Sequence, residues 1–276
     1  MFRNPEWGDD RFELWLVAIA NLLPLAGYGV LDWEFITVVQ LYCLDAITLL
    51  VVYGGCAMFA QRNSLVEERE ETLLPVIGGG TNQSDEPWTI DLHRSLPSIY
   101  PRNLRIVVPP VLFCVFLVLS AGVVLTGQAD WSGGGRPAVP ISPFLAALSE
   151  FTSPLVLGAA LAIVAAHLVT VPRGYFRRRR HEALSAYTTL ELPVRFVLLY
   201  GGFVTLYFFV GLSILLFAES TVAESNAERV GTITVLSGFF VMRIALERER
   251  FRAERSTDPD GLAAWVVPTD PRSERG

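Results

Sequence analysis

Long apolar stretches alternate with polar segments along this chain. Six of the stretches are as long as a membrane span: 13–31, 34–58, 106–127, 144–171, 194–218 and 230–247. A helix rises about 1.5 Å per residue, so roughly 20 apolar residues cross the hydrocarbon core of a bilayer. The pattern therefore predicts an all-α, polytopic integral membrane protein with six transmembrane helices.

Proline positions predict the shapes of two of these helices. Pro24 and Pro154 each lie inside an apolar stretch, where a proline removes one backbone hydrogen bond and kinks the helix. We therefore expect kinks in the first and fourth helices, with Ser142 and Pro143 as the N-cap and first residue of the fourth. Very few residues join the first helix to the second, so these two should form a tight antiparallel hairpin.

Arginine marks one side of the predicted bundle. All 22 basic residues of the chain are Arg. If six helices cross the membrane, every arginine except Arg136 and Arg229 lies on the side of the membrane that holds the N-terminus. Loops rich in Arg are retained in the cytoplasm. The sequence therefore predicts a plasma-membrane protein with both termini in the cytoplasm.

This topology divides the chain into one membrane domain and its cytoplasmic segments. The expected parts are a transmembrane hairpin at 1–60, a cytoplasmic polar loop at 61–103, transmembrane helices at 104–247 with a basic cytoplasmic loop at 172–192, and a partly disordered cytoplasmic tail at 248–276. In the tail, Arg250 and Glu254 lie one helical turn apart, so the sixth helix is expected to extend beyond the membrane. The apolar run LAAWVV at 262–267 is suited to docking on the membrane interface.

Composition agrees with a membrane protein and restricts its chemistry. Hydrophobic residues make up 51% of the chain, the formal net charge is −6 and lysine is absent, which indicates either a high-salt organism or a GC-rich genome. The first apolar run lacks a small-residue cleavage site, so we expect its helix to stay in the mature protein. Cys43, Cys56 and Cys114 lie in apolar runs without close pairing, so neither a disulfide framework nor a thiolate metal site is expected.

Two polar residues lie deep inside the predicted hairpin. Counted from the turn at Asp32, both Asn21 and Asp45 fall near the bilayer midplane. Helical spacing places Tyr42 near the face of Asp45, and Pro24 frees a backbone carbonyl beside Asn21. These residues are therefore the candidate intramembrane polar site.

The carboxylate of Asp45 needs a partner at this depth. An isolated charge there costs about 2.5–3.5 kcal/mol on insertion scales, so Asp45 should face protein and be protonated or hydrogen-bonded. No arginine is expected at its level, because Arg195 and Arg243 lie close to cytoplasmic helix ends and should extend toward the surface. One interpretation of Asp45 is a proton-binding or substrate-contacting group. The other is an interhelical hydrogen bond with Asn21, worth about 0.6 kcal/mol in a membrane.

Glu150 is a second carboxylate inside the predicted membrane region. It lies in the outer third of the fourth helix, and Pro154 frees its backbone carbonyl. If helices one to three and four to six were inverted repeats, the paired broken helices would mark a transporter site. Glu150 is therefore the residue that we expect to act with Asp45 if the protein is a carrier.

A basic cluster follows the fourth predicted helix. It consists of Arg173, Arg177, Arg178, Arg179 and Arg180. Arginines at a membrane surface attract anionic lipid head groups by about 1 kcal/mol each, and they also determine topology. The lipid bilayer is the partner that the sequence predicts, a membrane or cytoplasmic protein partner stays open, and nothing in the pattern indicates binding of nucleic acid.

Motifs of catalysis and of metal or cofactor binding are absent from the sequence. The His-Glu pair at 181–182 continues as ALSA rather than as a zinc motif, and neither GGG run is followed by Lys-Ser or Lys-Thr as in a phosphate loop. We therefore expect no enzyme activity, no cofactor and no metal. Two functions remain: a structural or partner-binding membrane protein with an Asn21–Asp45 contact, or a small proton-coupled carrier that uses Asp45 and Glu150.

One segment resembles a known family. The stretch NLLPLAGYGVLDWEFITVVQLYCLD contains, in order, Asn21, Pro24, Trp33, Tyr42 and Asp45. It is similar to the start of domain of unknown function 6498, a prokaryotic membrane family that is widespread in haloarchaea and commonly carries Glu where this chain has Asp45. The run YPRNLR before the third helix also resembles haloarchaeal members. The resemblance implies a membrane location and the hairpin site, and it brings no activity.

Overall fold

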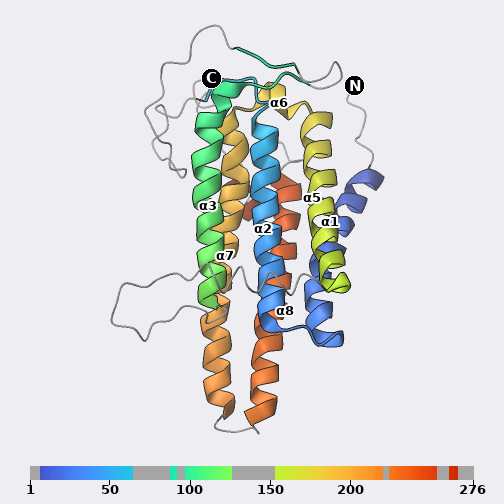
Figure 1. Cartoon of the computed structure of the whole chain (residues 1–276), viewed down its shortest axis with the longest axis vertical. Coiled ribbons are helices and arrows are strands. Elements are labelled where there is room, and N and C mark those ends of the chain that lie inside the picture. The colour runs from blue at the N-terminus through green and yellow to red at the C-terminus, as the bar shows by residue number, and fades with distance from the viewer. Residues whose placement is uncertain are drawn as a thin grey trace, which may run out of the picture. The chain divides into compact units, whose positions relative to one another are not determined.

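The computed structural model describes residues 7–64, 88–91, 97–125, 153–219, 224–253 and 261–266. Its helices are α1 (Trp7–Val30), α2 (Phe35–Ala57), the 3-10 turn η1 (Pro101–Asn103), α3 (Leu104–Leu125), α5 (Pro154–Arg177), α6 (Arg180–Ala183), α7 (Ala186–Glu219), α8 (Glu224–Ala253) and α9 (Gly261–Val266) (Figure 1). Strand pairing in these ranges is limited to two isolated bridges, Arg62 with Ser185 and Ile90 with Ile99. The described part of the chain is therefore all-helical, as predicted.

Four segments of the described residues are long and apolar enough to cross a bilayer. They are Phe12–Val30, Phe35–Ala57, Pro101–Val123 and Pro154–Arg177. By length and composition, these helices indicate a membrane protein. Helices α7 and α8 cover the fifth and sixth predicted stretches, and crossings there stay predictions, as does the orientation derived from arginine.

The structure describes the fourth predicted helix only from Pro154 onward, as α5. α5 starts at Pro154, and residues 144–152, which include Glu150, lie outside the described residues. The predicted cap at Ser142 and Pro143 lies outside them as well, so the kink at Pro154 stays a prediction. α1, by contrast, is described on both sides of Pro24 and runs as one helix through it.

A short turn joins α1 to α2. The backbone N–H groups of Leu31 and Trp33 both donate to the carbonyl oxygen of Gly27, at 3.0 and 3.1 Å. Asp32 adopts a left-handed conformation with φ of 52°, which lets the chain reverse direction within this turn. The predicted tight hairpin is therefore formed, and its length determines which residues of α1 and α2 face each other.

Gly27 provides a test of this turn, because the Trp33 ring lies where a side chain would be. A Cβ atom at Gly27 would lie 2.0 Å from Trp33 Cε3, whereas a Cβ at Gly29 would have no neighbour within 4 Å. We expect Gly27→Ala to lower the free energy of unfolding by about 1–3 kcal/mol, because the ring must move out of a packed position. Gly29→Ala is the matched control, and equal unfolding curves for the two variants in detergent would contradict the prediction.

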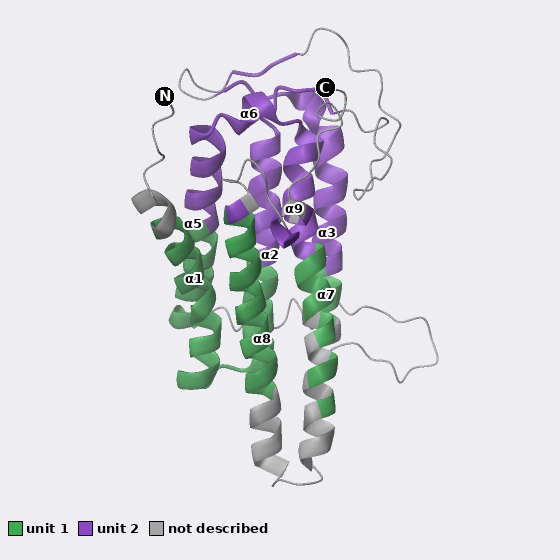
Figure 2. Ribbon diagram, turned by 180° about the vertical axis from the view of Figure 1, so that it is seen from behind, with its two compact units in different colours: residues 1–45, 118–166, 198–251 green, residues 46–117, 167–197, 252–276 purple. Residues whose placement is uncertain are grey.

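The described helices group into two compact units (Figure 2). Unit 1 consists of residues 1–45, 118–166 and 198–251, and unit 2 consists of residues 46–117, 167–197 and 252–276. Helices α2, α3, α5 and α7 each contribute one part to each unit. The polar residues of the predicted hairpin site all belong to unit 1.

The core of unit 1 is a cluster of small and branched apolar side chains from α1, α2 and α5. Its buried members are Val17, Ala20, Leu41, Val156, Ala159, Ala160, Ile163 and Ala166. The α5 members recur at helical spacing, and their alanines let neighbouring helix backbones approach closely. This packing, with Leu44 and Trp33 at its edge, holds the first half of α2 against α1.

In unit 2, residues from distant parts of the chain form hydrogen bonds with the C-terminal end of α2 and the residues that follow it. Asn103 Nδ2 donates to the carbonyl oxygen of Ala57, the last residue of α2, at 3.0 Å and to that of Ala60, three residues further on, at 2.9 Å. The backbone N–H of Gln61 donates to the carbonyl oxygen of His181 at 2.8 Å. The beginning of the predicted polar loop therefore packs against the segment that follows α5.

Most of the predicted basic loop at 172–192 is helical. α5 continues to Arg177, α6 follows, and α7 begins at Ala186 rather than near residue 194. Ser185 caps α7, because its Oγ accepts a hydrogen bond from the backbone N–H of Thr188 at 3.2 Å. The apolar pattern missed these turns since their residues include Thr188 and Glu191, which are polar and yet buried.

Candidate functional site

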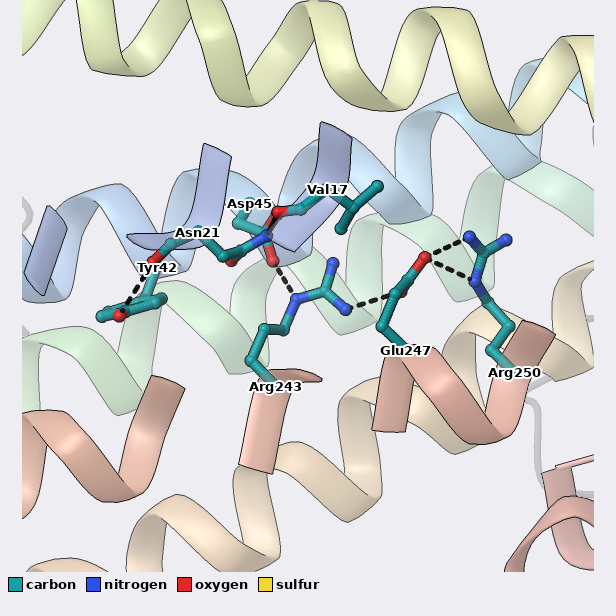
Figure 3. Close-up of polar contacts among 7 residues, drawn as sticks. All are labelled: Val17, Asn21, Tyr42, Asp45, Arg243, Glu247 and Arg250. Atoms are coloured by element: carbon teal, nitrogen blue, oxygen red, sulfur yellow. Dashed lines mark hydrogen bonds and ion pairs between the residues drawn. The ribbon is translucent and has the colours of Figure 1, made fainter. Parts of the chain in front are cut away.

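The structure brings Asn21, Tyr42 and Asp45 together in unit 1 (Figure 3). Asn21 Nδ2 donates to Asp45 Oδ1 at 3.4 Å and to the backbone carbonyl of Val17, one turn earlier on α1, at 3.0 Å. The Tyr42 hydroxyl donates to the backbone carbonyl of Asn21 at 3.3 Å. Asn21 and Asp45 are each only 1% exposed, and Asp45 lies near the middle of α2.

The other two members of the predicted polar site do not join this cluster. Pro24 is buried within α1 without a polar contact of its own, and Glu150 lies outside the described residues. The contact between Asn21 and Asp45 follows from the short turn, because a hairpin of fixed length sets two residues at equal depth opposite each other. Three of the five residues therefore meet for the reason that the sequence suggested.

The expectation that no arginine lies at the level of Asp45 is wrong. Arg243 of α8 donates from Nε to Asp45 Oδ2 at 2.5 Å, and its side chain is fully buried. The expectation that Arg243 extends toward the surface is wrong for the same reason. It assumed that the membrane crossing ends near residue 247, a few residues beyond Arg243, whereas the contact with Asp45 places Arg243 beside the middle of α2.

Arg243 belongs to a chain of buried charges on one face of α8 (Figure 3). Its Nη1 donates to Glu247 Oε2 at 2.8 Å. Arg250 in turn binds Glu247 Oε1 through Nε, at 3.0 Å, and through Nη2. Glu254, which the sequence places one helical turn from Arg250, lies outside the described residues. We call Asp45, Arg243, Glu247 and Arg250 the charge network.

Alternating signs make the charge network neutral as a whole. It contains two carboxylates and two guanidinium groups, and each carboxylate contacts a guanidinium. Burying one charge alone in a membrane protein costs several kcal/mol, and close pairing with hydrogen bonds offsets that cost. Glu247 and Arg243 are both fully buried, so the pairing is what makes their burial tolerable.

Tyr200 of α7 is a further member of the surroundings that the sequence did not indicate. It is 7% exposed, and it lies close enough to Tyr42, Asp45 and Arg243 for their charges and hydroxyl to act on it. Among the described residues its hydroxyl has no hydrogen-bond partner, and neither does Asn21 Oδ1. Two polar atoms without partners therefore lie in the surroundings of the charge network.

The chemistry available at this site is that of ion pairing. Within the described ranges, no group of three or more His, Cys, Asp or Glu residues is placed to hold a metal ion. The three cysteines are buried and unpaired. The site therefore offers charge compensation and hydrogen bonding, with Asp45 and Glu247 as its two titratable acids.

The basic cluster belongs to unit 2. Arg173, Arg177 and Arg179 are exposed, whereas Arg178 and Arg180 are half-buried. Arg179 has a left-handed backbone with φ of 50°, at the break between α5 and α6. The cluster thus presents several guanidinium groups at one end of α5, where binding of lipid head groups stays a prediction.

Comparison of the chain with protein-family models, with curated protein sequences and with solved structures finds no match. The resemblance of residues 21–45 to the haloarchaeal membrane family stays a prediction.

Proposed function

We propose that this chain is a structural or partner-binding membrane protein in which the charge network ties α2 to α8 and its polar segments carry the binding function. The observation that supports the proposal is the salt bridge between Asp45 and Arg243. A carboxylate that accepts two hydrogen bonds from a buried guanidinium and an amide is occupied in a stabilising contact. That use of Asp45 needs no exchange of protons or ligands.

The arrangement of partners favours this role over transport. A carrier group must lose and regain its partner in each cycle, yet Arg243 is bound at once to Asp45 and to Glu247. Moving it would separate two buried ion pairs, each of which is expensive to break. The network is therefore better suited to joining helices than to cycling.

The wider proposal follows the sequence. We infer six crossings with both termini in the cytoplasm of the plasma membrane. The basic cluster would then face the cytoplasmic leaflet, where its arginines contact anionic head groups. The exposed or half-buried residues 61–64 and 97–102, which belong to the same unit, are the surface on which a protein partner would bind.

Proton exchange at Asp45 tests the proposal. Infrared difference spectra of the protein in lipid, with Asp45→Asn identifying the band, should show an Asp45 carboxylate band that is unchanged as pH is varied around neutrality, because the buried Arg243 guanidinium stays bound to it. A Glu150→Gln background removes the other predicted membrane acid, and Glu182→Gln, at an exposed acid, is the control for bands that do not come from Asp45. A protonated Asp45 band that grows on acidification near neutral pH would contradict the structural role.

One observation favours a second candidate, the proton-coupled carrier. Asn21 Oδ1 and the Tyr200 hydroxyl are buried and have no hydrogen-bond partner in the described part of the chain, although each could bind a polar solute. A buried polar atom left without a partner costs about 1–3 kcal/mol, and binding of a solute during transport would remove that cost. In this candidate Asp45 and Arg243 separate during the cycle, with Glu150 as the second acid, and the infrared experiment decides between the two.

A further inference from the structure

α9 contacts Arg195 of α7 within unit 2. Arg195 Nη1 donates to the backbone carbonyl of Trp265 at 2.5 Å, and its guanidinium carbon lies 5.4 Å from the centroid of the Trp265 ring. Nε and Nη2 of the same guanidinium donate to Glu191 Oε1 at 3.1 and 2.5 Å. Each nitrogen of the guanidinium is thus occupied, and Nη1 would lose its acceptor if α9 moved away.

The two faces of α9 differ in burial. Ala263 is fully buried, whereas Leu262 and Trp265, which lie one turn apart, are 49% and 41% exposed. Gly261 starts the helix in a left-handed conformation with φ of 58°, which other residues adopt at a cost. α9 therefore buries one side within the unit and leaves Leu262 and one side of the Trp265 ring exposed.

The surroundings of α9 favour lipid as the covering of this exposed face. Arg195 lies about 13 Å along the axis of α7 from its first residue, beyond the polar turns at Thr188 and Glu191. Unit 2 also contains parts of three helices that are apolar enough to cross a bilayer. The outward side chains of α3 in this unit, such as Leu104 and Leu112, are apolar and exposed in the same way.

We propose that α9 is an anchor in the membrane interface, with Leu262 and Trp265 inserted among phospholipids and Arg195 holding the helix at that depth. Tryptophan is enriched at the level of lipid head groups, where its ring is in apolar surroundings and its N–H meets water. Short amphipathic segments bind there through the apolar area that they bury. The proposal does not depend on the role of Asp45.

Tryptophan fluorescence tests this placement. One variant keeps Trp265 alone, and a matched control keeps only Trp88, which is 72% exposed in the same unit. In vesicles of phosphatidylcholine and phosphatidylglycerol, lipid brominated near the glycerol end of its chains should remove most of the Trp265 emission, while acrylamide in water has little effect. The Trp88 control should show the opposite pattern.

Arg195→Lys tests the second half of the proposal. Lysine keeps the charge and a donor but lacks the planar fork that binds Glu191, the Trp265 carbonyl and the ring together. In the Trp265-only protein this change should reduce quenching by brominated lipid and shift the emission to longer wavelength, with helix content by circular dichroism equal to the parent.

Three results would overturn the proposal. Quenching of Trp265 by acrylamide and not by brominated lipid would mean that α9 faces water. Emission insensitive to both quenchers would mean that protein, either this chain or a second copy, covers the helix. Unchanged lipid quenching in Arg195→Lys would mean that Arg195 does not hold α9 at its depth.

Discussion

Asp45→Asn is expected to lower the free energy of unfolding by about 3–5 kcal/mol, because it removes one of the two carboxylates that the fully buried Arg243 contacts and leaves two buried guanidinium groups with one acid. Asparagine has nearly the shape of aspartate and keeps one acceptor oxygen. The decrease in the free energy of unfolding therefore measures mainly the effect of removing the charge. Arg243→Met should cause a loss of the same order by stranding Asp45. Unfolding in mixed micelles, followed by circular dichroism as the fraction of denaturing detergent rises, measures both.

The double variant with Asn at 45 and Met at 243 makes this prediction specific to the ion pair. It removes one acid and one base and leaves Glu247 paired with Arg250, so its loss should be smaller than the sum of the two single losses. Arg248→Met is the matched control, since Arg248 is exposed on the same helix and its replacement should change stability by no more than about 0.5 kcal/mol. Additive losses in the double variant would contradict an energetic coupling between Asp45 and Arg243.

Glu247→Gln is expected to have a comparably large effect, about 3–5 kcal/mol, because Glu247 separates two arginines. The change leaves Asp45 alone to balance two buried guanidinium groups. Glutamine retains one acceptor oxygen, which cannot replace two charge-assisted contacts. The same unfolding measurement applies, with Glu249→Gln as the neighbouring control on α8.

Removal of the second arginine should partly restore the Glu247 variant. Glu247→Gln combined with Arg250→Met leaves one acid, Asp45, with one base, Arg243, so charge balance returns. We expect the combined variant to unfold at a higher detergent fraction than Glu247→Gln alone. If the combined variant is as unstable as Glu247→Gln or less stable, charge imbalance does not explain the loss of stability. The lost hydrogen bonds of Glu247 would then explain it.

The hairpin and its polar contact could be predicted because both are local. Apolar runs of bilayer length indicate α1 and α2, and the few residues between them leave one way to align the helices. Counting from the turn then places Asn21 opposite Asp45, and the structure has their side chains within hydrogen-bonding distance. No information from the rest of the chain is needed for this step.

Arg243, the partner on α8, could not be predicted in the same way, because its depth was inferred from the assumed end of the sixth membrane crossing. Hydropathy averages over a window, so a charged segment is taken as outside the membrane even when its charges cancel. A signal was nevertheless present. Arg243, Glu247 and Arg250 follow one another at spacings of four and three, which places them on one helix face with alternating sign. Such a face, together with an unpaired membrane acid elsewhere, indicates buried pairs.

Buried polar groups explain the other difference between pattern and structure. The first turns of α7 contain Thr188, Thr189 and Glu191, each about 2% exposed. Because these residues are polar, the hydropathy pattern assigns them to a loop. Ser185 followed by Thr188 was a readable helix start, and it was outweighed by the arginines just before it. Capping residues thus locate this helix better than apolar content does.

Asp45 and Arg243 are 198 residues apart in the chain. At about 5–20 residues per second, a ribosome needs roughly 10–40 s to reach Arg243 after Asp45 has been made. For that interval the carboxylate must reside in the translocation machinery or the membrane without its base. Asn21 is already synthesised by then and lies within hydrogen-bonding distance in the finished hairpin. Its amide is therefore suited to accompany Asp45 through biosynthesis, until α8 arrives with the charge that completes the pair.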